Sequence, residues 1–351
     1  MSMTTPNSGF PAGAKRARDG KGADWRGMLR GLLAAIMEGD DDEIAQDKEF
    51  QESEHPRDDD GKFATGSGSG SSSKSNHLPT RIENGKRVAL SGTPLPKHIE
   101  ALKIPPAWSD VTYSDDPKSA LLATGKDAKG RRQAIYSDEF SAKQAAIKFS
   151  RISELNDKFG YISDQNEEAR RSKDPKKSAA ADCTKLIMTT GIRPGSEDDT
   201  GAEKKAYGAT TLEGKHVVID GNSVRLKFVG KKGVSLDIPV TDQATSEMLR
   251  ERKKAAGDDG QLFPISEKNL LDHVHTLDGG GFKTKDFRTL LGTRTAMIEV
   301  AKRPAPKDMA SYKKYVMDVA KIVSTKLGNT PTIALQAYIN PAVFADWKIA
   351  T

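Results

Sequence analysis

Two arginines, a lysine and a tyrosine stand far apart in the second half of this 351-residue chain, each within a distinctive short phrase. The phrases are Thr-Gly-Ile-Arg-Pro-Gly around Arg193, Phe-Val-Gly-Lys ending at Lys231, Lys-Asp-Phe-Arg ending at Arg288, and Leu-Gly-Asn-Thr-Pro at 327–331 ahead of Tyr338. Guanidinium groups match the geometry of phosphate and stay protonated at neutral pH. Nearby cations also favour the ionised form of a phenol. Together these side chains can hold a phosphodiester while a phenol attacks its phosphorus atom.

A tyrosine is a weak nucleophile at neutral pH, because a phenol has an ordinary pKa of about 10. We expect Arg193 and Arg288 to favour the phenolate of Tyr338 and to stabilise the charge that develops on the phosphoryl oxygens. Expulsion of a nucleotide 5′-oxygen requires a proton, which Lys231 can supply as a general acid. Asn329 can donate a hydrogen bond to a non-bridging oxygen. Because side chains supply the cations, we expect no metal ion and no other cofactor.

Each of these residues also has an ordinary structural role open to it. Arg193 could be a surface-turn arginine, and Lys231 a solvated lysine at the tip of a hairpin. Arg288 could form a salt bridge on a helix, and Tyr338 could be a half-buried core residue. The order and spacing of the whole set, rather than any one member, favour the chemical interpretation.

The surrounding pattern predicts the elements that position this set. Helices are expected over 139–190, and three strands at 216–220, 223–229 and 234–240, with Lys231 in the second turn. After Asp242 the chain is expected to be mostly helical. An apolar face runs along 308–327 up to Gly328, where a helix would end. Thr330 as N-cap and Pro331 as first helical residue then place Tyr338 about two turns into a short last helix.

Upstream of these helices, residues 80–145 are expected to form short strands separated by turns. Within them, residues 126–133 carry four cations in eight positions. A loop of this kind is either a solvated turn or a phosphate contact, and the rest of the chain favours the contact.

Charge is distributed unevenly along the chain. Its formal net charge is +6, yet residues 1–75 contain ten Lys and Arg against fourteen Asp and Glu, so the remainder carries about +10. A basic body favours a polyanionic partner, most simply nucleic acid, although many soluble proteins are basic. The single cysteine, Cys183, excludes a disulfide framework and a Cys-based zinc site and fits a reducing compartment, where it is expected to fill the core.

The first 79 residues read as an acidic, Gly/Ser-rich, disordered leader in which 24–37 could form a short amphipathic helix. Within this leader, the phrase at 55–63 resembles a joining segment of phage and prophage polypeptides. The chain has no stretch of the roughly 18 apolar residues needed to span a bilayer and no signal-peptide core. We therefore expect no membrane association.

The motifs together resemble the type IB DNA topoisomerases, specifically the compact poxvirus-like and bacterial branch, over roughly residues 80–345. Besides the four phrases above, the resemblance rests on Ile-Pro-Pro-Ala-Trp at 104–108, Gly-Arg-Arg-Gln at 130–133 and Tyr-Gly-Ala-Thr-Thr-Leu at 207–212. It implies an α+β fold, with a small antiparallel β-rich DNA-clamp domain at 80–145. A mainly helical catalytic domain at 146–351, containing a three-stranded hairpin sheet, would follow.

The resemblance also assigns roles to individual residues. Arg193 and Arg288 would bind the scissile phosphate, Lys231 would be the general acid, with Lys232 as a fallback, and Tyr338 would be the nucleophile. Asn329 stands where many members carry His and others Asn. The residues expected to contact DNA are Lys129, Arg131, Arg132, Gln133, Tyr136, Lys232 and Lys285. Ala134 replaces a Tyr that relatives often carry, which weakens the expectation of a strong cleavage-site preference.

The implied activity is relaxation of supercoiled double-stranded DNA through a transient 3′-phosphotyrosyl link, without ATP or metal. One chain supplies the full set, which favours a monomer while a dimer stays open. The implied location is the cytoplasm, at a bacterial nucleoid or in association with a phage or virus. Two alternatives stay open: a tyrosine recombinase such as a phage integrase, and a non-catalytic duplex-DNA-binding protein. Recombinases usually place His three residues before the second arginine, where this chain has Lys285.

Overall fold

The computed structural model describes residues 77–195 and 205–347, which form two compact units. The boundary between the units falls between Lys148 and Phe149, inside the long helix α5 (Asp138–Arg170). The leader helix expected at 24–37 and the phrase at 55–63 lie outside the described residues. Each unit is described below by itself.

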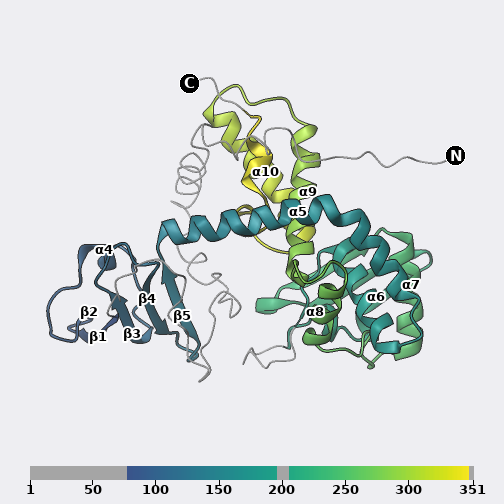
Figure 1. Cartoon of the computed structure of the whole chain (residues 1–351), viewed down its shortest axis with the longest axis horizontal. Helices are drawn as coiled ribbons and strands as arrows, with labels where there is room; N and C mark the ends of the chain where they lie inside the picture. Colours follow the sequence, from purple (N-terminus) through teal and green to yellow (C-terminus); the bar gives the residue numbers. More distant parts are fainter. Residues whose placement is uncertain (1–76, 196–204, 348–351) are drawn as a thin grey trace. The chain divides into compact units, whose positions relative to one another are not determined.

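The N-terminal unit is built on a five-stranded antiparallel sheet with the strand order β2-β1-β3-β4-β5 (Figure 1). Its strands are β1 (His77–Glu83), β2 (Lys86–Ala89), β3 (Ser109–Ser114), β4 (Leu121–Lys126) and β5 (Arg132–Tyr136). The first strand begins at His77, three residues before the start expected from the sequence. Strands β4 and β5 form a hairpin in which Lys126 pairs with Arg132, so the basic loop is the turn between them.

A short helix, α4 (Lys97–Glu100), contributes Ile99 to an apolar core together with residues of β3 and β4, including Tyr113 and Ala123. On another part of this unit, Arg87 donates hydrogen bonds to the carbonyl oxygens of Pro105, Pro106 and Trp108, at 2.8–3.4 Å. These bonds hold the Pro-Pro-Ala-Trp phrase, whose two prolines have no N–H group to donate and whose Trp108 N–H donates to the carbonyl oxygen of Pro105.

The C-terminal unit is mainly helical and contains the expected three-stranded sheet, β6-β7-β8. Its strands are Val217–Asp220, Ser223–Val229 and Ser235–Val240, and its larger helices after α5 are α6 (Pro175–Thr190), α7 (Gln243–Ala256), α8 (Glu267–Thr276), α9 (Thr284–Ala301) and α10 (Met309–Leu327). Asp174, Asp242, Ser266 and Asp308 cap four of these helices through their side chains, which satisfies N–H groups that a helix leaves open. The α+β class with a three-stranded hairpin sheet is therefore confirmed.

The end of the chain departs from a regular helix. Gly328 adopts a left-handed conformation that ends α10, and the Thr330 hydroxyl accepts from the N–H of Ile333, as its N-cap role requires. The following helix α11 (Pro331–Ile333) passes directly into a π-helical segment, η5 (Ala334–Tyr338). Tyr338 is thus the last residue of a π turn, whereas the sequence predicted ordinary α-helix. Of the apolar face expected along α10, Met309 and Ile322 are exposed.

Cys183 is buried in α6, as expected for a core residue, and burial raises the pKa of its thiol. Among the helices in the described parts of the chain, none combines the length and the apolar character needed to cross a bilayer.

A buried histidine gives the fold a pH-dependent stability. His273 in α8 lies 2.9 Å from the Oδ1 atom of Asn166, and burial, followed by the charge of Lys177, lowers its pKa to about 4. The unfolded chain binds a proton near pH 6.5, so the free energy of unfolding should fall by roughly 2 kcal/mol between pH 7.5 and 4.5 on account of this residue. Urea unfolding of the wild type and of His273→Gln at both pH values isolates the effect. Equal pH dependence in the two proteins would contradict it.

Candidate active site

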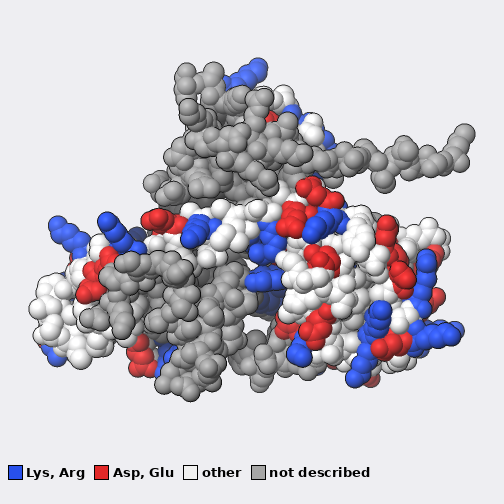
Figure 2. All heavy atoms as spheres, in the orientation of Figure 1, with Lys and Arg blue, Asp and Glu red and all other residues white. Residues whose placement is uncertain are grey.

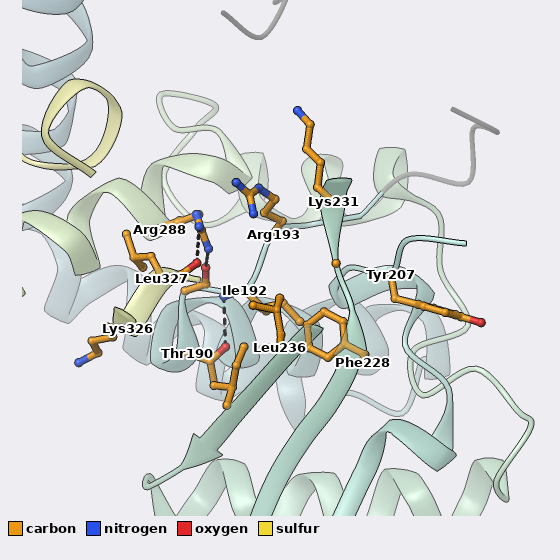
Figure 3. A pocket seen from close by; sticks show the side chains of 13 residues that line it. Thr190, Ile192, Arg193, Tyr207, Phe228, Lys231, Leu236, Arg288, Lys326 and Leu327 are labelled. Atoms are coloured by element: carbon orange, nitrogen blue, oxygen red, sulfur yellow. Dashed lines mark hydrogen bonds between the residues drawn. The ribbon is translucent and has the colours of Figure 1, made fainter. Parts of the chain in front are cut away.

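Three of the predicted catalytic side chains line one pocket in the C-terminal unit. Arg193 follows α6, Lys231 lies in the 3-10 turn between β7 and β8, and Arg288 lies in α9. In Figure 3, Arg193 and Lys231 extend toward the same side of the pocket, above apolar side chains of its wall. Those apolar residues include Ile192, Phe228 and Leu236.

The position of Arg193 depends on Gly191, which ends α6 in a left-handed conformation with φ 68°. A Cβ atom at Gly191 would lie 2.7 Å from Leu327, so glycine is needed for both its conformation and its contact. The carbonyl oxygen of Arg193 accepts from the N–H of Ala209 at 2.8 Å, which fixes its backbone. Its partly exposed guanidinium forms no hydrogen bond or ion pair with the residues that the structure describes. This cation is therefore available to an anionic ligand.

Arg288 is buried, with 3% of its surface exposed, and it joins the ends of two helices. Its Nη1 atom donates to the carbonyl oxygen of Gly191, and its Nη2 atom donates to that of Leu327 at 2.6 Å. Carbonyl groups at a helix C-terminus have no partner within the helix, so these bonds satisfy groups that would otherwise be buried without donors. Arg288 thus has a structural role in addition to its predicted chemical one.

The aromatic ring of Tyr338 lies against this arginine. The Cζ atom of Arg288 is 4.7 Å from the ring centroid, within the range of a cation–π contact. The structure thereby brings the predicted nucleophile next to one of the two predicted phosphate-binding arginines.

Asn329 lies two residues beyond Leu327, whose carbonyl oxygen Arg288 binds. Both polar atoms of its side-chain amide are buried, and neither has a hydrogen-bond partner within the described parts of the chain. A buried amide in this condition is costly in free energy, which makes it a candidate for binding a ligand oxygen.

Lys231 is exposed at the turn between β7 and β8. The turn is closed by hydrogen bonds from the N–H of Gly230 to the carbonyl oxygen of Val234 and from the N–H of Gly233 to that of Gly230. The side chain of Lys232 lies outside what the structure describes. Lys285 is partly exposed in the first turn of α9, three residues before Arg288.

The basic loop of the N-terminal unit is organised by Asp127, which the sequence interpretation did not single out. One carboxylate oxygen of Asp127 accepts from the Arg131 side chain at 2.7–2.8 Å and from the Gln133 amide at 3.0 Å. The other accepts from the backbone N–H groups of Lys129 and Arg131. Arg131 and Arg132 are exposed, so the loop presents cations from a fixed backbone.

Tyr136 ends β5, and its ring stacks on Phe140 with centroids 5.1 Å apart. It is partly buried.

Among the residues that line the pocket of Arg193, the sequence interpretation gave no role to Tyr207 or Lys326. Figure 2 shows basic and acidic side chains interspersed on the visible face, so surface charge in that view does not outline a binding site.

The chain also matches known protein families and individual proteins. A family model described as eukaryotic DNA topoisomerase I, catalytic core, matches residues 137–343, and one described as bacterial DNA topoisomerase IB, N-terminal domain, matches residues 84–127. The chain is 25% identical over 280 residues to DNA topoisomerase 1B of Acanthamoeba polyphaga mimivirus, covering 72% of this chain and 82% of that one. It is 24% identical over 258 residues to DNA topoisomerase 1B of Vaccinia virus (strain Copenhagen), covering 69% and 78%.

The family model of the catalytic core covers more than half of the chain. The chain belongs to the type IB DNA topoisomerase family, within its poxvirus-like branch. It is therefore an isomerase that relaxes DNA by the type IB mechanism.

Proposed function

We propose that Arg193, Lys231, Arg288, Asn329 and Tyr338 carry out the type IB reaction of this chain on double-stranded DNA. The observation that carries the proposal is the convergence of three separate elements on one pocket. Arg193, Lys231 and Arg288 line it, and the ring of Tyr338 packs on Arg288 at 4.7 Å.

In the proposed cleavage step, the phenol of Tyr338 gives its proton to solvent, and the resulting phenolate oxygen attacks the scissile phosphorus. A 3′-phosphotyrosyl ester forms, and the bond to the 5′-oxygen breaks. The departing oxygen takes a proton from the ammonium group of Lys231 and becomes a 5′-hydroxyl. In religation, that hydroxyl returns its proton to Lys231 and attacks the ester, and Tyr338 leaves as a phenolate that takes a proton from solvent. One ester replaces another in each step, so no nucleotide is consumed.

The arginines stabilise the charge that develops on the phosphoryl oxygens between these two states. Arg193 lines the pocket and is partly exposed, so its guanidinium is available to an anion. Arg288 acts from a buried position, where a fixed cation is more effective than in water. The amide of Asn329 supplies a hydrogen bond to a non-bridging oxygen, which would satisfy a polar group that is otherwise buried without a partner among the described residues.

The proposed DNA contacts outside the pocket come from the basic loop, from α9 and from the turn between β7 and β8. The loop supplies Lys129, Arg131, Arg132 and Gln133, with Tyr136 beside them, while Lys285 and Lys232 extend the contacts around the pocket. Most of these groups would meet phosphates, so affinity should fall steeply as salt is raised. One chain holds the whole catalytic set, which supports action as a monomer.

The direct test is relaxation of a supercoiled plasmid in EDTA without ATP, combined with a nicked substrate that traps the covalent intermediate. Relaxation under these conditions and protein attached to the 3′ end of the cut strand are expected. A requirement for magnesium or nucleotide, or attachment to the 5′ end, would overturn the proposal.

The general-acid role of Lys231 predicts a specific pattern of rescue. Lys231→Ala should slow cleavage of ordinary DNA by about 10²–10⁴-fold, because the 5′-oxygen then leaves without a proton. A substrate with sulfur in place of that oxygen has a leaving group of much lower pKa, so the same variant should cleave it at close to the wild-type rate. Single-turnover cleavage of both substrates measures this.

The matched control is Lys232→Ala, which removes the neighbouring lysine from the same turn. It should cleave both substrates at rates within a few-fold of the wild type. If Lys232→Ala were instead the variant that cleaves ordinary DNA slowly and the sulfur-containing substrate at close to the wild-type rate, the general acid would be Lys232.

A further inference from the structure

One threonine of α9 contacts the backbone at Tyr338 and just after it. The hydroxyl of Thr293 donates to the carbonyl oxygen of Tyr338 and accepts from the N–H of Asn340, and both distances are 3.1 Å. The hydroxyl uses its single proton in the bond to the carbonyl oxygen and a lone pair in the bond from the N–H, so the two bonds can form together. Thr293 is fully buried. One buried side chain therefore holds the backbone that directly follows the predicted nucleophile by two hydrogen bonds.

This use of a helical threonine differs from that of three other threonines in α6 and α9. Thr184, Thr190 and Thr295 direct their hydroxyls to carbonyl oxygens four residues earlier in their own helices, at 2.6–2.9 Å. Such back-bonding is the usual arrangement of a threonine inside a helix. Thr293 instead directs its hydroxyl away from α9 and links two separate elements.

The segment around Tyr338 needs such a link, because regular helix ends there. The N–H of Ile339 closes the π turn on the carbonyl oxygen of Ala334 at 3.0 Å, and Ile339 is already extended. The carbonyl group of Tyr338 is thus one of those that a helix end leaves without an internal donor. Thr293 supplies the donor.

Helix α9 also approaches this backbone unusually closely. A Cβ atom at Gly292 would lie 2.8 Å from the carbonyl oxygen of Tyr338 and 3.1 Å from its Cβ atom. The glycine permits the approach, and the neighbouring Thr293 forms the bonds. The same helix carries Arg288, whose guanidinium contacts the ring of Tyr338.

We propose that Thr293 is a positioning residue that sets the direction of the Tyr338 side chain relative to Arg288. This inference rests on the proposed function of Tyr338 as the nucleophile. Because α9 carries both Thr293 and the phosphate-binding arginine, the two hydrogen bonds fix the phenol relative to the phosphate. A misplacement of roughly 1 Å can cost about 10²-fold in rate.

The test compares three variants in single-turnover cleavage and religation. Thr293→Val keeps the shape and removes both bonds, so it should slow cleavage and religation alike, by about 10–100-fold. The phenol is the nucleophile in cleavage and the leaving group in religation, so the ratio of the two rates should stay near the wild-type value. The Kd for DNA should also stay near the wild-type value. Thr293→Ser keeps the hydroxyl and should retain most of the rate. Thr295→Val removes a hydroxyl bound within the same helix and should also remain fast.

Wild-type rates in Thr293→Val, equal slowing in Thr295→Val, or a serine variant as slow as the valine variant would each overturn the inference. Rates are compared at a temperature at which thermal unfolding shows every variant folded, and Thr293→Ala replaces the valine variant if that one does not fold. A covalent adduct in Tyr338→Phe would overturn the proposed function itself. An inactive Tyr338→Phe beside a fast Thr293→Val would overturn the positioning role alone.

Discussion

Replacing Tyr338 with Phe is expected to abolish covalent attachment to DNA and, with it, relaxation of supercoiled plasmid. The change removes one oxygen atom and keeps the ring that packs on Arg288 at 4.7 Å. Without the phenol there is no nucleophile for the phosphorus, so the loss should be complete within the limits of a trapping assay. Affinity for duplex DNA should change little, because it derives mainly from cationic side chains that remain in place.

The appropriate control is Tyr207→Phe, because Tyr207 lines the same pocket. Its ring packs on His216 with centroids 4.2 Å apart, a contact that phenylalanine preserves. The control should still form the adduct on a nicked substrate, and mass spectrometry of the trapped peptide should place the nucleotide on Tyr338. An adduct in Tyr338→Phe, or a modified Tyr207 in the wild type, would contradict the assignment.

The elements that carry these residues were predictable because their signals are local. Strand β7 runs from Ser223 to Val229, as the alternation and the flanking turns predicted. Gly328 ends α10 and Thr330 caps the next helix, since both act through hydrogen bonds to residues only a few positions away.

The convergence of the set could not be derived from spacing alone. Arg193 and Arg288 are far apart in sequence, and their meeting in one pocket depends on how α9 packs against α6. The resemblance to a known family supplied that expectation. It did not supply the structural role of Arg288, which arises because the carbonyl ends of α6 and α10 meet at its guanidinium.

Other features are hidden from sequence patterns for physical reasons. The π turn of Tyr338 has the same residue types as an α-helix, and it contacts residues distant in sequence such as Thr293. A threonine that bonds across helices looks identical in sequence to one that bonds within its own helix. Asp127 reads as one acidic residue in a basic loop until its hydrogen bonds to Arg131 and Gln133 are known.

The two arginines should respond differently to substitution, because only one of them also supports the fold. Arg193→Ala should slow cleavage by about 10²–10³-fold through loss of transition-state stabilisation. Its effect on the free energy of unfolding should stay within about 0.5 kcal/mol, since none of the described residues depends on its guanidinium for a hydrogen bond. Single-turnover cleavage and urea unfolding measure the two effects separately.

Arg288→Ala should show the same loss of rate together with a loss of roughly 3 kcal/mol in unfolding free energy, because the carbonyl groups of Gly191 and Leu327 would be buried without their donor. Arg288→Lys keeps the positive charge, but a lysine lacks the planar fork that lets arginine bind both carbonyl oxygens and a phosphate. Cleavage by this variant should therefore be at least about 10-fold slower than in the wild type. If Arg193→Ala were the destabilised variant and Arg288→Ala the stable one, the division of roles between an open and a buried arginine would be wrong. Equal rates in Arg288→Lys and the wild type would show that charge alone suffices at this position, and the fork geometry would then have no part in catalysis.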